Sequence, residues 1–257
     1  MLEHLAFSDP WSLAMATLSV ALVGFAKGGL GGAMAIMGMA TLSLVVPPVQ
    51  AAAILLPILL MMDVVSLLSW WREWDVRVIK IMLPGALVGI AIGWATAAMV
   101  SDGVIRLIVG GIALIFVVRW ATSGKAARAE AKPHNPRAAA FWSTISGYTS
   151  FVAHAGGPPY QIYAVPLRLP PRIYTGTSVA VFSIVNAVKV IPYFALGLFG
   201  ADNLATSAVL MPVAILATLA GVAVVKRMSA EVFYPIMYAM LCLISIKLIW
   251  DGISALR

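Results

Sequence analysis

Long apolar segments separated by short polar ones run along most of the chain. Six of them are nearly free of charged residues, and each is about as long as a bilayer core of roughly 30 Å requires of a helix. Because lipid offers backbone groups no partners, such segments must be helical. The alternating runs of about ten residues typical of a membrane barrel are not visible. The pattern predicts an all-α, polytopic membrane protein with spans at 51–71, 81–100, 104–120, 174–198, 207–225 and 230–250.

Two further apolar stretches are interrupted by glycine-rich breaks. In the first, residues 12–26 and 33–46 flank GGLGG, and in the second, residues 138–153 and 159–167 flank AHAGGPP. These arms are short for full crossings, so each pair is interpreted as a re-entrant helical hairpin whose tip reaches into the membrane. Irregular backbone at that depth is tolerated only where protein or a water-filled cavity surrounds it. The two breaks therefore predict the position of a binding site.

An internal repeat relates the two halves of the chain. When the first half is shifted by 123 positions, Asp63 falls on Asn186 and Trp70 on Tyr193. The same shift brings the two glycine motifs and two Pro-Pro pairs together, namely Gly24-Phe25 with Gly147-Tyr148 and Pro47-Pro48 with Pro170-Pro171. Each half is predicted to hold one broken hairpin followed by three transmembrane helices. The first repeat is assigned to residues 1–122, a polar linker to 123–137 and the second repeat to 138–257.

Loop charges predict the orientation of the two repeats. Lysine and arginine concentrate in the central linker and in three other segments, 72–80, 168–172 and 226–229. They are absent from 47–50, 101–103 and 199–203. Basic loops stay in the cytoplasm, so the linker is predicted to be cytoplasmic and both termini periplasmic. Each repeat-related pair of loops then changes sides. The halves are therefore expected to be inverted repeats, a common plan for secondary transporters.

Composition agrees with a membrane protein and argues against several other classes. Hydrophobic residues make up 62% of the chain and charged residues 11%, whereas a soluble domain carries roughly 25% charge. The net charge of +7 is explained by topology, so no nucleic-acid partner is expected. The phosphate-loop and nucleophile-elbow motifs are missing, and the histidines and single cysteine lack zinc-site spacing. We expect neither an enzyme nor a metal or other cofactor.

Ionisable and polar residues inside the apolar segments are candidates for function, because burying them in a membrane is costly. Lys27 could attract an anion or bond carbonyls at the hairpin tip, and His154 could donate to an oxyanion, carry a proton or be satisfied structurally. Unpaired N–H groups at the breaks would suit an anion. The predicted substrate-binding set is Lys27, Gly28, Gly29, Gly31, Gly32, His154, Gly156, Gly157, Tyr160, Gln161, Asn186 and Lys189.

Asp63 occupies the middle of an apolar segment and has two interpretations. Lys189 lies one helical turn from Asn186, the repeat equivalent of Asp63, so Asp63 and Lys189 are expected to form a structural ion pair between the halves. If they do not pair, Lys189 becomes a second contact for an anion. Asp63 then becomes a candidate proton carrier.

The two glycine motifs carry a resemblance to a known family. GFAKGGLGG at 24–32 is followed by Pro47-Pro48, and SFVAHAGGPPYQIY at 150–163 is followed by TGTS at 175–178. In this order the chain resembles the sulfite exporter TauE/SafE family, also called the toluene sulfonate uptake permease family. The resemblance implies transport of sulfite, sulfoacetate or other organosulfonates in a bacterial inner membrane.

The functional hypothesis is a secondary transporter or facilitator that exports a small sulfur-containing anion. A membrane potential that is negative inside favours anion exit by roughly 2.3 kcal/mol per charge per 100 mV. The alternatives are a proton-coupled carrier of another small organic solute, a cation or amine carrier that uses Asp63, and a membrane-embedded enzyme or assembly subunit. Expected partners are the small anion and the lipid bilayer, and the sequence leaves a homodimer open.

Overall fold

The computed structural model describes residues 9–30, 32–96, 101–123, 130–152, 155–195 and 200–256. These described parts are helical and contain no strand. The first half holds α1 (Pro10–Phe25), a distorted turn η2 (Ala26–Leu30), α2 (Gly32–Leu42), α3 (Pro48–Ser69), α4 (Val76–Thr96) and α5 (Asp102–Thr122). The second half holds α7 (Pro136–Val152), α8 (Gly157–Ala164), η3 (Val165–Leu167), α9 (Pro171–Ala195), α10 (Ala201–Val225) and α11 (Ala230–Ala255).

Six helices in the described parts are long and apolar enough to cross a membrane. The all-α, polytopic prediction is thereby confirmed. Five of the six correspond to predicted spans, whereas the predicted span 51–71 appears among the described residues only as a shorter apolar helix, Ala53–Ser69. The sixth is the first hairpin arm, which was predicted to be too short for a crossing. It runs for 20 residues, Pro10–Gly29. The Asp9 side chain caps the Ser12 N–H at 2.9 Å and Pro10 occupies the first helical position, so the helix begins two residues earlier than its apolar stretch suggested.

Both broken hairpins return to the end of the molecule from which they start. α3 begins beside the start of α10, where Gln50 Nε2 donates to Asn203 Oδ1 at 3.3 Å. α1 packs along α10, so α1 enters at this end and α2 returns to it. In the second hairpin, the Lys132 N–H before α7 donates to the Pro166 carbonyl after α8 at 2.9 Å. This bond ties the two ends of the second hairpin together.

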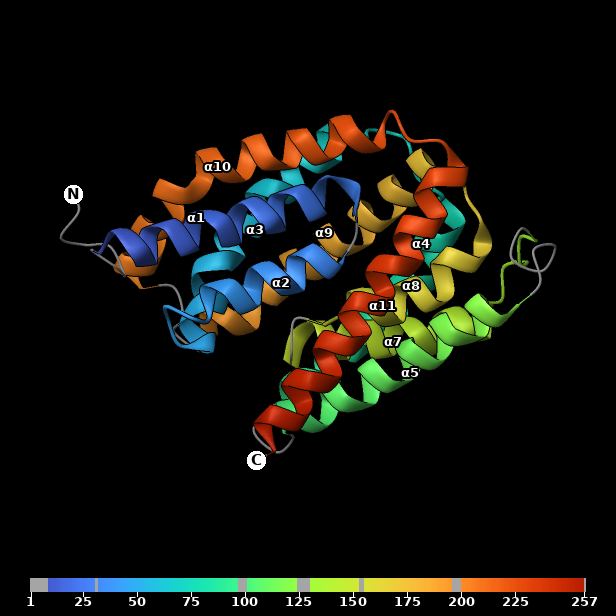
Figure 1. Ribbon diagram of the computed structural model, residues 1–257, viewed down its shortest axis with the longest axis horizontal. Helices are drawn as coiled ribbons and strands as arrows, with labels where there is room; N and C mark the ends of the chain where they lie inside the picture. Colours follow the sequence, from blue (N-terminus) through green and yellow to red (C-terminus); the bar gives the residue numbers. More distant parts are fainter. Residues whose placement is uncertain are drawn as a thin grey trace.

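One helix of each half packs on helices of the other half. α10 of the second half packs on α1 and α3, and α4 of the first half packs on α7 and α9. α5 and α11 lie side by side (Figure 1). Glycines permit these contacts at two positions that the predicted repeat makes equivalent: a Cβ on Gly24 would lie 2.8 Å from Ala217 Cβ on α10, and one on Gly147 only 2.0 Å from the Ala86 carbonyl oxygen on α4.

Four basic segments meet at one end of the bundle. The Arg172 guanidinium lies 3.8 Å from Glu73 in the 72–80 segment, and it donates to the Lys226 carbonyl at 3.3 Å. His134 of the central linker lies 3.8 Å from Asp75. These contacts join 72–80, the linker, 168–172 and 226–229.

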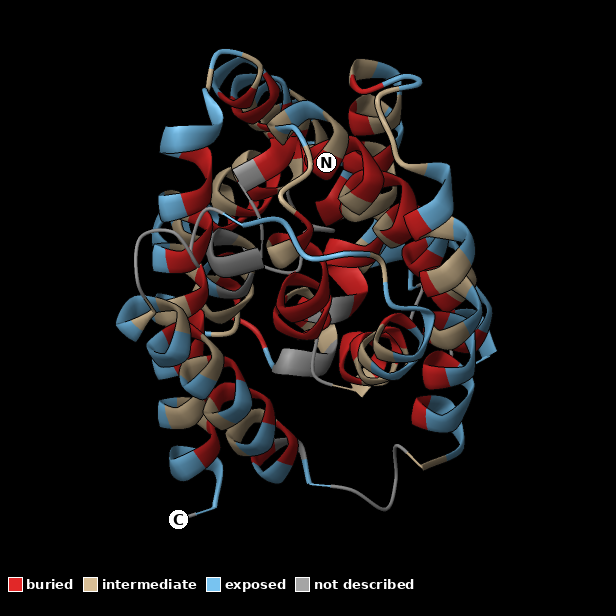
Figure 2. Cartoon of the chain, turned by 90° about the vertical axis from the view of Figure 1, so that its right-hand side faces the viewer, coloured by how far each residue is buried: buried red, intermediate tan, exposed pale blue. Residues whose placement is uncertain are grey.

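Burial separates a largely apolar interior that also holds polar residues from an apolar outer surface. Figure 2 shows buried residues concentrated on the inner helices and exposed ones along the outer faces. Many exposed side chains are large and apolar, such as Leu68, Ile115 and Leu216, as expected of helices that face lipid. Buried polar and charged residues include Asp63 and Lys189. Their position in the interior makes this region the candidate site.

The α4–α7 contact gives a prediction about stability. Gly147→Ala should lower the melting temperature in detergent and cost on the order of 1–3 kcal/mol, because the new methyl group would force the two backbones apart. Gly111→Ala on α5 is the matched control, since a Cβ there would meet nothing within 4 Å. Equal melting temperatures for the two variants would contradict the close packing of α4 on α7.

Candidate functional site

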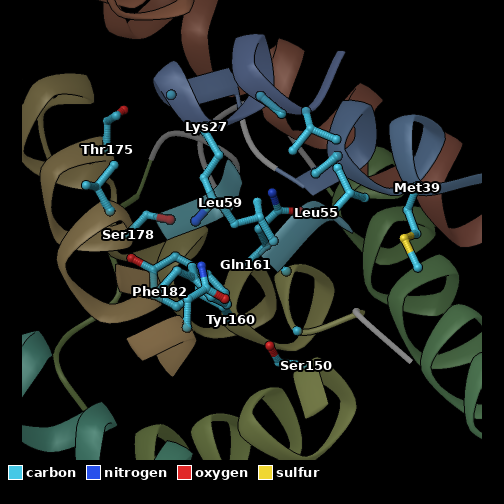
Figure 3. A pocket seen from close by; sticks show the side chains of 18 of the residues that line it. Lys27, Met39, Leu55, Leu59, Ser150, Tyr160, Gln161, Thr175, Ser178 and Phe182 are labelled. Carbon is cyan, nitrogen blue, oxygen red and sulfur yellow. The ribbon is translucent and has the colours of Figure 1, made fainter. Parts of the chain in front are cut away.

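A cavity of about 140 Å³ lies where the two broken hairpins meet α3 and α9. It is smaller than the roughly 300–1,000 Å³ of pockets for drug-sized ligands, so its size suits a small solute. Its apolar lining includes Leu55, Leu59 and Phe182. Figure 3 shows Lys27 reaching into it from the first break, opposite Tyr160 and Gln161 of the second hairpin and Ser178 of α9.

The first break is fixed by its neighbours as well as by its own glycines. Gly29 has a φ of 142°, a conformation that favours glycine. The carbonyls freed by the distortion find donors on α3: Ser66 Oγ donates to the Lys27 carbonyl and Trp70 Nε1 to the Gly28 carbonyl, both at 3.2 Å. Backbone polar groups inside a membrane require such partners. The Gly29 conformation and these hydrogen bonds stabilise the break, which places Lys27 and Gly29 on the cavity wall.

The second break brings Gly156 and Gly157 to the cavity at the start of α8. Ser146 Oγ donates to the Gly156 carbonyl at 2.7 Å and holds the turn in place. Pro158 and Pro159 follow in the first turn of the helix and have no N–H to offer. The positive N-terminal end of α8 therefore lies at the cavity, but it has fewer free backbone N–H groups than the sequence analysis expected.

Asp63 lies beside the cavity and holds together residues of both halves. Lys27 Nζ lies 2.5 Å from one carboxylate oxygen of Asp63, and Asn186 Nδ2 donates to the other at 2.7 Å. Asp63 and Asn186 are 123 positions apart, the shift of the predicted repeat, so two positions expected to be equivalent touch. The Asp63 side chain is only 4% exposed. A charge at this depth needs such partners to be tolerated.

The expected ion pair between Asp63 and Lys189 does not form. The carboxylate is occupied by Lys27 and Asn186 instead, which leaves Lys189 without an acidic partner among the described residues. Lys189 is 1% exposed. Its ammonium group donates to the carbonyl of Ser150 at 3.2 Å and lies 3.4 Å from the Ser150 hydroxyl oxygen. Lys189 is therefore a buried lysine at the cavity wall with no acidic side chain within salt-bridge distance among the described residues.

Other polar groups at the cavity also lack partners. The side-chain oxygens of Gln161, Tyr174 and Thr175 are buried and accept or donate no hydrogen bond among the described residues. Buried polar atoms are normally paired, so these three can be satisfied by a bound solute or by water. The described residues contain no cluster of histidine, cysteine or acidic side chains that could hold a metal ion. The unpaired groups along the cavity wall include two hydroxyl donors, those of Tyr174 and Thr175, which lie about 20 Å along α9 from Lys189.

The structure gathers most of the predicted binding residues around one cavity and places the others elsewhere. Gly28 packs against α10, where a Cβ would lie 2.5 Å from the Thr218 carbonyl oxygen. Gly32 begins α2, and Gly31 and His154 lie outside the described residues. Those that line the cavity are Lys27, Gly29, Gly156, Gly157, Tyr160, Gln161, Asn186 and Lys189.

The predicted substrate-binding set left out part of the cavity on α9. Thr175 and Ser178 line it together with Asn186 and Lys189, and the spacing of these four residues places them on one face of a helix. That periodicity was visible in the sequence. The neighbouring Thr177 has a structural part instead, because its hydroxyl donates to the Ile173 carbonyl at 2.6 Å and accepts the Asp75 N–H at 2.7 Å.

A family model described as sulfite exporter TauE/SafE matches residues 16–248. The chain belongs to this family. A TauE/SafE protein is a transporter, so its partners are a small anionic substrate and membrane lipid. The match covers both hairpins and all six membrane-competent helices of the described parts, except for the first and last few residues. Comparisons with curated proteins and with solved structures gave no match.

The ion pair in this TauE/SafE protein gives a second stability prediction. Lys27→Met should cost about 3–5 kcal/mol of folding free energy, because Asp63 would be left buried and charged with Asn186 as its one remaining partner among the described residues. Lys27→Met/Asp63→Asn should be less destabilised than Lys27→Met alone. Thermal unfolding of the purified variants in detergent measures both effects. A double variant whose loss equals the sum of the two single losses would show that the pair is not coupled.

Proposed function

We propose that this TauE/SafE protein is a secondary transporter or facilitator that exports a small sulfur-containing oxyanion, sulfite or an organosulfonate, across a bacterial inner membrane. The observation that carries the proposal is Lys189. It is a lysine buried in the wall of a small cavity with no acidic side chain to balance it among the described residues. Uncompensated charge at this depth is costly. A bound anion would supply the missing partner.

The remaining groups at the cavity suit an oxyanion. An ammonium group has three donors, and Lys27 Nζ uses one of them on Asp63. The hydroxyls of Tyr174 and Thr175 have no partner among the described residues, but they lie about 20 Å along α9 from Lys189 and would contact a solute only at another point of the cavity. Leu55 and Phe182 add apolar surface, which accommodates the carbon part of a sulfonate.

The arrangement of helices supports two inverted halves, 1–122 and 138–257, with the site between them. Helix contacts between the two halves occur in matching pairs: α10 on α1 matches α4 on α7, and α10 on α3 matches α4 on α9. The basic segments join at one end, whereas Gln50 meets Asn203 among segments that lack lysine and arginine. With the basic end in the cytoplasm, the linker 123–137 is cytoplasmic and both termini are periplasmic.

Export of an anion needs no ATP in this arrangement. A potential that is negative inside drives one negative charge outward with roughly 2.3 kcal/mol per 100 mV. A cation carrier would need a carboxylate free to meet its solute. Asp63 is already held by Lys27 and Asn186, which favours the anion over the cation.

Transport assays on two lysine variants test the proposal. Lys189→Gln should reduce sulfite efflux from proteoliposomes at least about tenfold, because it removes the uncompensated charge that attracts the anion. Lys27→Gln should reduce it as well, since it removes a donor at the first break and frees Asp63 to repel the solute.

Lys247→Gln on α11 is the matched control. Lys247 forms an ion pair with Asp251 of the same helix at 2.5 Å, away from the cavity residues, and its side chain is 36% exposed. Its loss should leave efflux unchanged. The proposal fails if folded Lys27→Gln and Lys189→Gln variants transport and bind sulfite as the unmodified protein does.

A further inference from the structure

We propose that Asp63 sets the charge of the solute, so that the site accepts singly charged oxyanions and excludes doubly charged ones. The inference rests on the proposed function and concerns its specificity. It follows from one juxtaposition: Asp63 contacts Lys27 at 2.5 Å, while Lys189 in the same cavity wall has no acidic partner among the described residues.

The three charged groups divide into a neutralised pair and a single cation. Lys27 and Asp63 balance each other, and the second oxygen of Asp63 is held by Asn186 Nδ2 at 2.7 Å. This second bond fixes the carboxylate, because rotation toward the cavity would break it. The ammonium of Lys189 is bonded to neutral Ser150 alone among the described residues. With both lysines protonated, two ammonium groups and one carboxylate leave one net positive charge for a bound solute to balance.

A net charge of one favours a matching anion. A monoanion beside Lys189 completes a balanced set in a region where charges are poorly hydrated. A dianion would leave one negative charge uncompensated. Lys27 could balance that charge only by leaving Asp63, whose own negative charge would then be uncompensated. Uncompensated charges in such surroundings are strongly disfavoured. Asp63 thus neutralises Lys27, the cation that a second negative charge on the solute would need.

Among the sulfur oxyanions, the proposed substrates are then those that carry a single negative charge. Hydrogensulfite and sulfonates with one acidic group carry a single charge and match the site. Sulfate carries two charges with nearly the same tetrahedral shape as a small sulfonate, so shape alone cannot separate the two. The charge of the site is what can distinguish methanesulfonate from sulfate.

Methanesulfonate and sulfate therefore make a matched pair of probes. Initial efflux rates of the two labelled anions are measured from proteoliposomes that contain the full-length protein. The unmodified protein should move methanesulfonate in preference to sulfate. Asp63→Asn raises the net charge of the site to two while keeping a side chain of the same shape. It should shift the rate ratio toward sulfate by at least about tenfold, since attraction between unit charges a few ångströms apart in a protein exceeds the free energy of a tenfold change.

A charge swap separates charge from local structure. Asp63→Asn/Asn186→Asp moves the carboxylate to the repeat-related position, retains an amide–carboxylate pair and keeps the net charge at one, so it should restore preference for methanesulfonate. Asn186→Asp alone brings the net charge to zero and should reduce transport of both anions. Variants are compared only when they elute as folded protein in size-exclusion chromatography.

The outcomes distinguish this inference from the function on which it rests. If the unmodified protein moves methanesulfonate and Lys189→Gln stops it, but Asp63→Asn leaves the rate ratio unchanged, the role of Asp63 is overturned and anion transport stands. If the unmodified protein prefers sulfate, the charge argument is likewise overturned. If it moves none of sulfite, methanesulfonate and sulfate, the proposed function itself fails.

Discussion

A helix that breaks inside a membrane must find partners for the backbone groups it frees, and this constraint organises the centre of the molecule. At the first break, the carbonyls of Lys27 and Gly28 accept hydrogen bonds from Ser66 and Trp70 of α3. Those bonds fix α3 against the hairpin. They also bring Asp63, from the same helix, within reach of the Lys27 ammonium. The ion pair is thus a consequence of how the broken backbone is satisfied.

The same constraint explains why small residues occupy the contacts between the halves. The distorted turn has no regular side-chain surface to pack, so α10 must approach its backbone directly. Gly28 and Gly221 permit this approach, since a Cβ on Gly221 would lie 2.3 Å from the Phe25 carbonyl oxygen. Close contact of this kind is how helices associate in lipid, where apolar side chains gain little by leaving their surroundings. Gly28 therefore serves packing against α10, whereas the neighbouring Gly29 lines the cavity.

Much of the architecture could be predicted from the sequence because membranes impose strong rules on it. Span length, loop charge and the need for internal hydrogen bonding each leave a visible pattern. The sequence pattern did not show which residue pairs with each buried charge. Asp63 could meet Lys27 or Lys189, and the choice depends on where the first break bends. The start of α1 was also missed, because a cap such as Asp9 extends a helix beyond its apolar stretch.

The difference between Asp63 and Asn186 gives the centre its chemical character. A repeat with identical residues at the two positions would place either two carboxylates or two amides in contact. Two carboxylates would repel each other and balance both lysines, which would leave no charge for an anion. Two amides would leave both Lys27 and Lys189 uncompensated, and a second buried charge would add a further cost to the empty site. One carboxylate and one amide hydrogen-bond to each other and leave Lys189 alone without an acidic partner among the described residues. In the proposed mode of anion recognition, this difference between Asp63 and Asn186 is therefore what sets the charge of the solute.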